Sequence, residues 1–227
     1  MRFGVGNGWR GLAAAVLLTG VAAGCGESGD DPGSAGGKAS ATAEVAARGE
    51  RIGAAGSACE LPVTFDMAEF WEAEAVDAAD RKTDTGDAAA DAIGDALVDL
   101  LRQGPVTMVC EIDAKPAGKL GFLRVWTGEP GEPGDADART VLEGFVGAEK
   151  TASGEKYRAF TSGAFSGTEV QYTTTSALLE ETKKERALAV STPDGPVVIH
   201  LGGMDTEEHE AMLPAFELAK STLKATS

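Results

Sequence analysis

The chain has 227 residues and a formal net charge of −16, with 43% hydrophobic but only 6% aromatic residues. A surface this acidic repels phosphate groups, so the composition excludes nucleic acid as a partner and excludes attachment to anionic lipids through a basic patch. The length fits one domain of ordinary size, and the scarcity of aromatic residues predicts a core built mainly from Ala, Val and Leu.

The first segment is typical of an export signal. Its only charged residues before position 25 are Arg2 and Arg10, and the apolar stretch from Leu12 to Ala23 is too short to cross a bilayer as a helix. Residues 17–25 read Leu-Leu-Thr-Gly-Val-Ala-Ala-Gly-Cys. This run resembles the lipobox of bacterial lipoprotein signal peptides.

The lipobox resemblance implies that residues 1–24 are a signal peptide. It also implies that Cys25 becomes the first mature residue and carries acyl chains, palmitate among them. The protein would then be anchored to the outer face of the cytoplasmic membrane. An ordinary secretory peptide cut near Ala23 is the alternative, and either signal would export the protein.

The three cysteines agree with export. If Cys25 is acylated, Cys59 and Cys110 are left as a pair in an oxidising compartment, and we expect a disulfide between them. Two separate buried thiols are the alternative. No Cys-x-x-Cys spacing occurs, so thioredoxin-like redox chemistry is not indicated.

Residues 25–57 are expected to form a flexible tether. The part from 26 to 37 is rich in Gly, Ser and Asp and has no apolar period. Alanines between positions 41 and 55 favour a helix weakly, but Gly49 and Gly53 oppose it. Residues 58–227 are expected to form a single domain.

The first half of this domain is predicted to mix strands and helices. Strands are expected at 63–67, 106–112 and 120–126. A helix over 87–103 would present Ile93, Leu97, Leu100 and Leu101 on one apolar face. A second helix, capped by Asp137 and running to 148, would turn Val141, Leu142, Phe145 and Val146 inward.

The second half is predicted to form hairpins followed by a long helix. Strands at 156–161 and 168–175 make one hairpin, and strands at 186–191 and 196–201 flank the turn Pro193-Asp194-Gly195. A final helix starts at Asp205, with Glu208 completing a capping box. Its buried stripe is Met212, Phe216, Ala219 and Leu223. The expected fold class is α+β, an antiparallel β-sheet covered by helices.

This order of elements resembles the PsbP-like fold and, within it, the mycobacterial LpqN-type lipoproteins. The resemblance is carried by the strand 63–67 with Trp71 nearby, the central antiparallel strands, and the last strand, 197–201, leading into the helix 205–224. The abundance of Ala and Gly resembles actinobacterial proteins. The resemblance to PsbP-like and LpqN-type proteins implies a non-enzymatic binding or accessory protein.

Few residues are candidates for catalysis. The only histidines are His200 and His209, and Leu213 stands where a zincin would have its second histidine. We expect His200 to end a strand and His209 to be a solvated residue at a helix start. The row Asp87, Asp91, Asp95 and Asp99 is expected to be a solvated face. No catalytic residue, metal or cofactor is therefore predicted, with a cell-wall- or lipid-modifying hydrolase using either histidine as the alternative function.

A cluster of basic residues is the candidate binding feature. Five basic residues lie close together along an otherwise acidic sequence, namely Lys156, Arg158, Lys183, Lys184 and Arg186. If their strands are neighbours, they would form a positive strip for an anionic protein partner or a cell-wall glycan. Ion pairing with the interleaved glutamates is the alternative. The sequence thus predicts a lipid-anchored, extracytoplasmic, monomeric binding or accessory protein.

Overall fold

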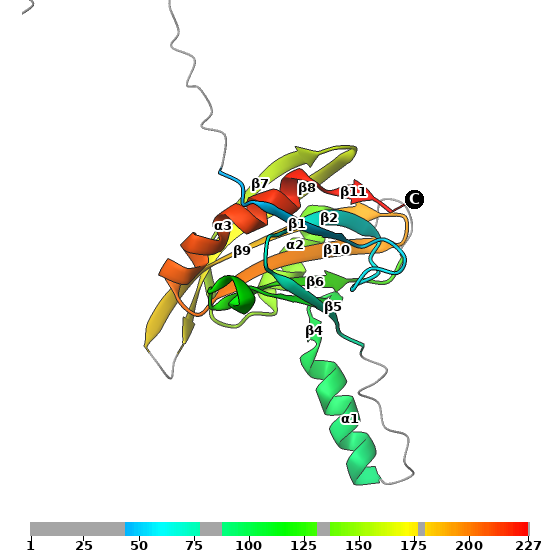
Figure 1. Ribbon diagram of the computed structural model, residues 1–227. Helices are drawn as coiled ribbons and strands as arrows, with labels where there is room; N and C mark the ends of the chain where they lie inside the picture. The colour runs from blue at the N-terminus through cyan, green and yellow to red at the C-terminus, as the bar shows by residue number, and fades with distance from the viewer. Residues whose placement is uncertain (1–43, 78–87, 131–136, 177–179, 227) are drawn as a thin grey trace, which may run out of the picture. The chain divides into compact units, whose positions relative to one another are not determined.

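The computed structural model describes residues 44–77, 88–130, 137–176 and 180–226 (Figure 1). All of them belong to one compact unit, which spans Ala41–Ser227. The signal sequence and Cys25 lie outside the described residues, as does Asp87.

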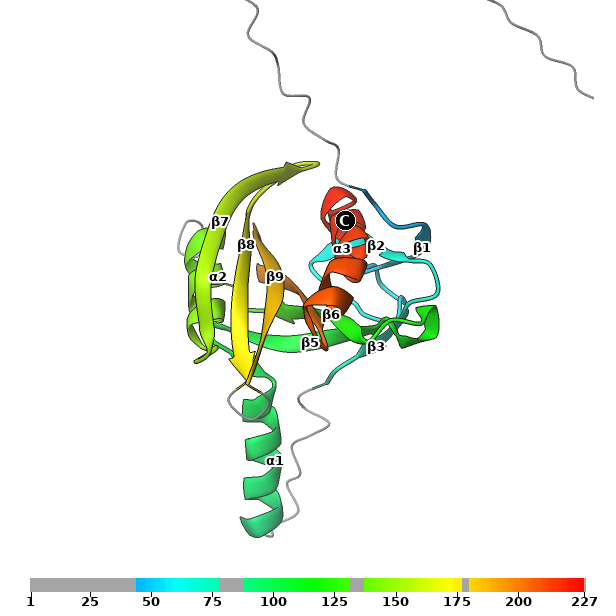
Figure 2. The same cartoon turned by 90° about the vertical axis from the view of Figure 1, so that its left-hand side faces the viewer.

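A large antiparallel sheet is the framework of this unit. Its strands follow the order β3-β5-β6-β10-β9-β8-β7, and β4 pairs with β5. The strands are β3 (Glu72–Ala75), β4 (Arg102–Gln103), β5 (Val106–Asp113), β6 (Gly121–Thr127), β7 (Ala152–Ser162), β8 (Phe165–Ser176), β9 (Glu181–Thr192) and β10 (Gly195–Gly203). The sheet is bent, so that β7, β8 and β9 turn away from the plane of β5 and β6 (Figure 2).

A second, three-stranded sheet has the order β1-β2-β11, with β1 at Arg48–Ile52, β2 at Val63–Ala68 and β11 at Lys224–Ala225. Strand β1 lies inside the segment that we expected to be tether, so the folded domain begins before residue 58. Arg48 and Arg51 fix β1 because both form ion pairs with the buried carboxylate of Asp66 on β2. A disulfide joins Cys59 to Cys110 on β5, with the two Cα atoms 5.9 Å apart.

Helices cover both faces of the large sheet. Helix α3 (Thr206–Ser221) and the small sheet cover one face, burying Phe216 against Ile199 and Leu201. Helix α2 (Ala138–Gly147) covers part of the other, where Phe145 packs on Trp126. Figure 2 shows the two helices on opposite sides of β8 and β9. The predicted α+β class with antiparallel sheets is therefore correct.

The sequence signals for both helix starts are confirmed at the atomic level. Asp137 accepts a hydrogen bond from the backbone of Arg139, and Asp205 accepts one from the backbone of Glu208. The side chain of Glu208 does not complete a capping box, because it accepts a hydrogen bond from the backbone of Leu120 instead. The side chain of Asp205 thereby caps the N-terminus of α3, and the side chain of Glu208 links the helix to the loop before β6.

Helix α1 (Ala88–Leu100) differs from the prediction in what it buries. Its position is close to the predicted 87–103, but Ile93 is 63% and Leu100 is 79% exposed. Leu101, just beyond the end of the helix, is buried. An apolar stripe on a helix predicts a face that needs a partner; it does not establish that the partner is the protein's own core.

Candidate ligand-binding site

A cavity lies on the half of the large sheet that α2 leaves uncovered. Its volume is about 580 Å³, within the range of small-molecule sites. The floor comes from neighbouring strands: Trp126 on β6, His200 on β10, Glu185 on β9 and Tyr172 on β8. Alternation along each strand explains the set, because Leu123, Val125, Ile199 and Leu201 point to the opposite, α3-covered face.

The register of the strands brings three polar side chains together. Tyr172 pairs directly with Glu185, and Glu185 pairs with Gly202. Because Gly202 has no side chain, the ring of His200 reaches across to Glu185: a Cβ atom on Gly202 would be 3.2 Å from His200 Cε1 and 3.4 Å from Glu185 Oε2. The glycine therefore makes room for the contact between histidine and carboxylate.

One nitrogen of His200 has two partners. Nε2 lies 3.2 Å from the hydroxyl of Tyr172 and 3.1 Å from Oε2 of Glu185. That carboxylate oxygen is buried and, within the part of the chain that the structure describes, has no hydrogen bond of suitable geometry. A single ring nitrogen either donates to the carboxylate or accepts from the hydroxyl, so one of these two polar groups keeps unused hydrogen-bonding capacity.

The remaining contacts keep Glu185 ionised and Tyr172 neutral. Oε1 of Glu185 lies 2.9 Å from Nζ of Lys183 and accepts a hydrogen bond from Thr174. Burial opposes ionisation, but His200 and Lys183 outweigh it and lower the pKa of Glu185 below its ordinary value. Burial and the nearby charge of Glu185 raise the pKa of Tyr172, so its hydroxyl stays protonated at neutral pH.

The charges around the cavity nearly cancel. Its lining holds four basic and three acidic side chains, namely Lys115, Lys119, Arg124, Lys183, Asp113, Glu149 and Glu185. Arg124 also forms an ion pair with Glu111, at 2.6 Å, and its guanidinium lies over the ring of Phe122. In a chain of net charge −16, the cavity is thus a locally balanced environment.

The rim of the cavity is partly apolar. Leu120 and Met204 both line it and both are exposed. The backbone of Met204 donates a hydrogen bond to the carbonyl of Leu120, which holds the two loops together. The cavity therefore combines a polar floor with an apolar rim.

The histidines lie differently from the prediction. His200 sits within β10 and not at its end, and His209 is only 1% exposed in the first turns of α3, so it is not a solvated residue. Burial lowers the pKa of His209 to about 4 although Glu185 opposes the shift, and its Nδ1 has no hydrogen-bond partner among the described residues. Over the same residues, no group of three or more His, Cys, Asp and Glu side chains has the geometry of a metal site.

The predicted basic strip is not a continuous positive surface. Strand β8 lies between β7, which carries Lys156 and Arg158, and β9, which carries the other three residues. Four of the five form ion pairs, joining Arg158 to Glu169, Lys183 to Glu185, Lys184 to Glu210, and Arg186 to Glu169 and Glu217. Glutamates on β8, β9 and α3 therefore neutralise most of the strip, and of its five residues only Lys183 lines the cavity.

Sequence reasoning missed the cavity as a site. Of its floor residues it singled out only His200, and Glu185 was counted only among the glutamates interleaved with the basic strip. Tyr172, Trp126 and Gly202 carry no motif spacing, because they come together only through the pairing of β6, β8, β9 and β10. The pair Gly202-Gly203, which follows His200 after one intervening residue, was the one local signal available.

The fold and the site together define an α+β domain with a polar-floored cavity on the open half of its sheet. The chain belongs to the family Lipoprotein_23, described as uncharacterised lipoprotein, whose model matches residues 29–223. This confirms the resemblance to bacterial lipoproteins. No curated protein matches the chain. No described helix is both long and apolar enough to span a membrane.

Two solved structures match the chain. The cyanobacterial PsbP protein CyanoP of Synechocystis sp. PCC 6803 is 12% identical, with a TM-score of 0.49, over 86% of this chain and 98% of that chain. LpqN of Mycobacterium tuberculosis, which is described as involved in cell envelope biogenesis, is 15% identical, with a TM-score of 0.39, over 78% of this chain and 91% of that chain. These are the two groups that the order of elements resembles.

Proposed function

We propose that this protein is a lipid-anchored, extracytoplasmic binding protein that holds an uncharged, hydroxyl-bearing group of a cell-envelope molecule in the cavity. It binds without catalysis. Family membership supports the lipoprotein character, and the run ending at Cys25 supports attachment to the outer face of the cytoplasmic membrane.

The observation that carries the proposal is the shared nitrogen of His200. Because Nε2 satisfies either Tyr172 or Glu185, the floor offers a ligand one free donor or one free acceptor. Leaving such a group buried and unpaired costs about 1–3 kcal/mol, and a ligand hydroxyl removes that cost because it both donates and accepts. A ligand hydroxyl can therefore pair with the floor whether Nε2 of His200 donates to Glu185 or accepts from Tyr172.

Charge balance decides against a charged ligand. An anion would meet Glu185 and Asp113, and a cation would meet Lys183 and Lys115. At the floor, Glu185 is already paired with Lys183 and Arg124 with Glu111, so a charged group placed there would give up its water without gaining an unpaired partner. A neutral group with several hydrogen-bonding positions has no such penalty.

The hydrolase alternative fits the geometry less well. In an acid–histidine–nucleophile arrangement the acid binds one ring nitrogen and the nucleophile the other, whereas here Glu185 and the Tyr172 hydroxyl share Nε2. The raised pKa of Tyr172 also keeps it a poor nucleophile at neutral pH. His209 is buried apart from the lining of the cavity.

The test is a binding titration of the chain from residue 26 onward, in which thermal unfolding and tryptophan fluorescence report binding. Soluble oligosaccharides of N-acetylglucosamine serve as the neutral probe, and citrate and spermidine serve as anionic and cationic probes. We expect the saccharide to raise the unfolding temperature and the charged compounds not to. Stronger binding of either charged compound would contradict the proposed ligand class, and hydrolysis of the saccharide would contradict the non-catalytic role.

The two tyrosines of the chain provide matched variants. Tyr172→Phe removes the hydroxyl at the cavity floor, so His200 serves Glu185 fully and no spare group remains; we expect saccharide affinity to fall by about tenfold. Tyr157→Phe removes a hydroxyl on β7, outside the cavity, where the ring lies under Arg139. Equal affinities for the two variants would show that the cavity is not the binding site.

A further inference from the structure

Exposed apolar side chains gather at one end of the domain. Among the described residues, six large apolar side chains are exposed, and two of these, Ile93 and Leu100, lie on α1. The other four are Phe70 (69% exposed), Met204 (67%), Val45 (50%) and Leu120 (46%). We call these four residues the apolar end.

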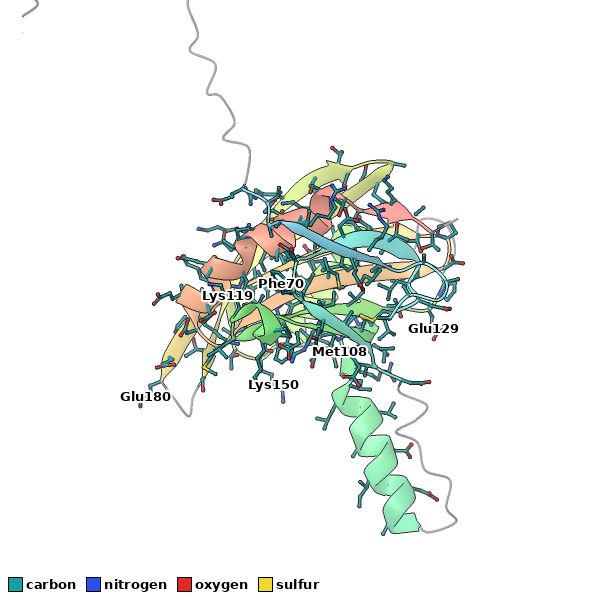
Figure 3. All side chains as sticks on the ribbon, in the orientation of Figure 1. Phe70, Met108, Lys119, Glu129, Lys150 and Glu180 are labelled. Carbon is teal, nitrogen blue, oxygen red and sulfur yellow. A yellow bond between two sulfur atoms is a disulfide. The ribbon has the colours of Figure 1, made fainter. Side chains whose placement is uncertain are left out.

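The members of the apolar end are linked through contacts. Met204 and Leu120 share a backbone hydrogen bond. Phe70 and Lys119, which precedes Leu120, line one groove together with Ala46, which follows Val45. Figure 3 shows the labelled side chains of Phe70 and Lys119 near each other. The four residues thus come from three turns and the N-terminal segment but form one surface.

Phe70 is held outward at a cost. Its backbone has φ of 65°, in the left-handed region that a bulky residue rarely occupies, and its ring is exposed. Such a conformation costs on the order of 1 kcal/mol, and packing of the exposed ring does not offset it. An aromatic ring that is exposed to solvent on a strained turn is typical of a surface that binds another molecule or assembly.

The chain enters the domain at this surface. The backbone of Ala46 donates to the carbonyl of Pro214, and that of Glu69 donates to Ala47, so the N-terminal end of the described chain runs beside Phe70. About twenty residues separate Glu44 from Cys25. As the flexible tether expected from the sequence, a segment of that length would have a root-mean-square reach of about 25 Å. An acyl chain on Cys25 would therefore keep the apolar end within reach of the bilayer.

We propose that the apolar end docks on the lipid bilayer that carries the anchor, with Phe70, Leu120 and Met204 entering the interfacial layer. This inference rests on the anchoring part of the proposed function. The contact is apolar rather than electrostatic, because Lys119 shares its groove with Glu69, and Asp205 and Glu207 line a second pocket together with Met204. Zwitterionic lipid is the expected surface, and anionic lipid weakens the contact.

Docking would place the mouth of the cavity at the membrane. Leu120, Met204 and Lys119 belong both to the cavity rim and to this surface or its groove. A ligand group that projects from the bilayer would then meet the polar floor of Tyr172, His200 and Glu185 without crossing open solvent. The apolar rim would thus contact the lipid, and the polar floor would bind the ligand.

The experiment reproduces the anchor chemically. The chain beginning at Cys25, with Cys59 and Cys110 in their disulfide, is coupled through the free thiol to a maleimide lipid in phosphatidylcholine vesicles. Phe70→Trp introduces a reporter into the apolar end, and Ile93→Trp introduces one at an equally exposed site on α1. Fluorescence quenching by brominated lipids is measured after subtraction of the signal from the native tryptophans.

We expect brominated lipid to quench Trp at position 70 at least several-fold more than Trp at position 93. Equal quenching at the two positions, or none at position 70, would overturn the docking proposal. In the uncoupled chain, Phe70→Ser with Leu120→Ser and Met204→Ser should lower vesicle binding by at least tenfold. Ile93→Ser with Leu100→Ser should not, and a rise in binding with anionic lipid would also contradict the proposal. Saccharide binding in solution does not depend on membrane docking. These results can therefore contradict the docking proposal without contradicting the proposed ligand site, and the saccharide titration can do the reverse.

Discussion

Nη2 of Arg51 lies 2.7 Å from Oδ1 of Asp66, a carboxylate that is almost completely buried. Nε of Arg48 lies 2.7 Å from the other oxygen, Oδ2. Two arginines of β1 thus enclose one acid of β2 and attach the N-terminal strand to the domain. This attachment places the start of the folded domain before residue 58, the boundary expected from the sequence.

Removing the two arginines should cost more stability than removing the charge between them. Arg48→Ala with Arg51→Ala leaves Asp66 buried without a partner, and we expect a loss of about 2–4 kcal/mol. Asp66→Asn leaves two partly exposed guanidinium groups in contact with water and should cost only about 1–2 kcal/mol. Urea unfolding monitored by circular dichroism measures both, and the reverse order would contradict the role given to the arginines.

Strand β1 shows why the start of the domain was missed. The glycines that argued against a helix in this segment have a structural role here, because a Cβ atom on Gly53 would be 1.9 Å from the carbonyl oxygen of Val63. The partner that makes residues 48–52 a strand lies at Val63–Ala68, and no local period in the sequence records that pairing. Short-range signals did suffice where the cause was local, as at Asp137, Asp205 and the turn before Gly195.

The disulfide should provide a large share of the stability. Its partners are 51 residues apart, and closing a loop of this size stabilises by about 4 kcal/mol on the chain-entropy model. Cys59→Ala with Cys110→Ala should therefore lower the free energy of unfolding by about that amount. Cys25→Ser, outside the described residues, is the matched control and should leave it unchanged. Free thiol at positions 59 and 110 in the exported protein would contradict the bridge.

Stability should fall in mild acid because of His209. Burial lowers its pKa to about 4, whereas an unfolded chain binds the proton near pH 6.5. Between these values the unfolded state binds more protons, so the stabilisation is complete above about pH 6.5 and is lost as the pH falls toward 4, by up to about 3 kcal/mol. Unfolding free energies from pH 7.5 to 4 measure this slope.

His209→Leu tests the assignment. The variant removes the titrating group at a position where Nδ1 has no hydrogen-bond partner among the described residues, so the fold should tolerate it. The slope between pH 6.5 and 4 should then flatten. The ionisable neighbours Glu185, His200, Arg186 and Glu210 all remain in the variant. An unchanged slope would assign the acid sensitivity to them.

The candidate site was less predictable than the fold for a related reason. The final helix was placed correctly from its cap and from the stripe of Met212, Phe216 and Ala219, which are all buried. That stripe does not show that His209, one turn earlier, is also covered. Likewise, Tyr172 is 28 residues from its partner His200 along the chain, so only the sheet register could bring them together.

The last prediction concerns Gly121, which supports the floor of the cavity from the opposite face of the sheet. A Cβ atom there would be 2.3 Å from Cε of Met212 and 2.5 Å from the carbonyl oxygen of Gly202. We expect Gly121→Ala to cost about 1–3 kcal/mol, because the side chain of Met212 is buried and the strand carbonyl cannot move away. It should also weaken ligand binding, since Gly202 gives His200 its room. Met212→Ala removes one of the two clashes, so the substitutions should couple by about 1 kcal/mol in a double-mutant cycle measured by urea unfolding. Strict additivity would show that helix α3 shifts freely over the sheet and does not hold the cavity floor in place.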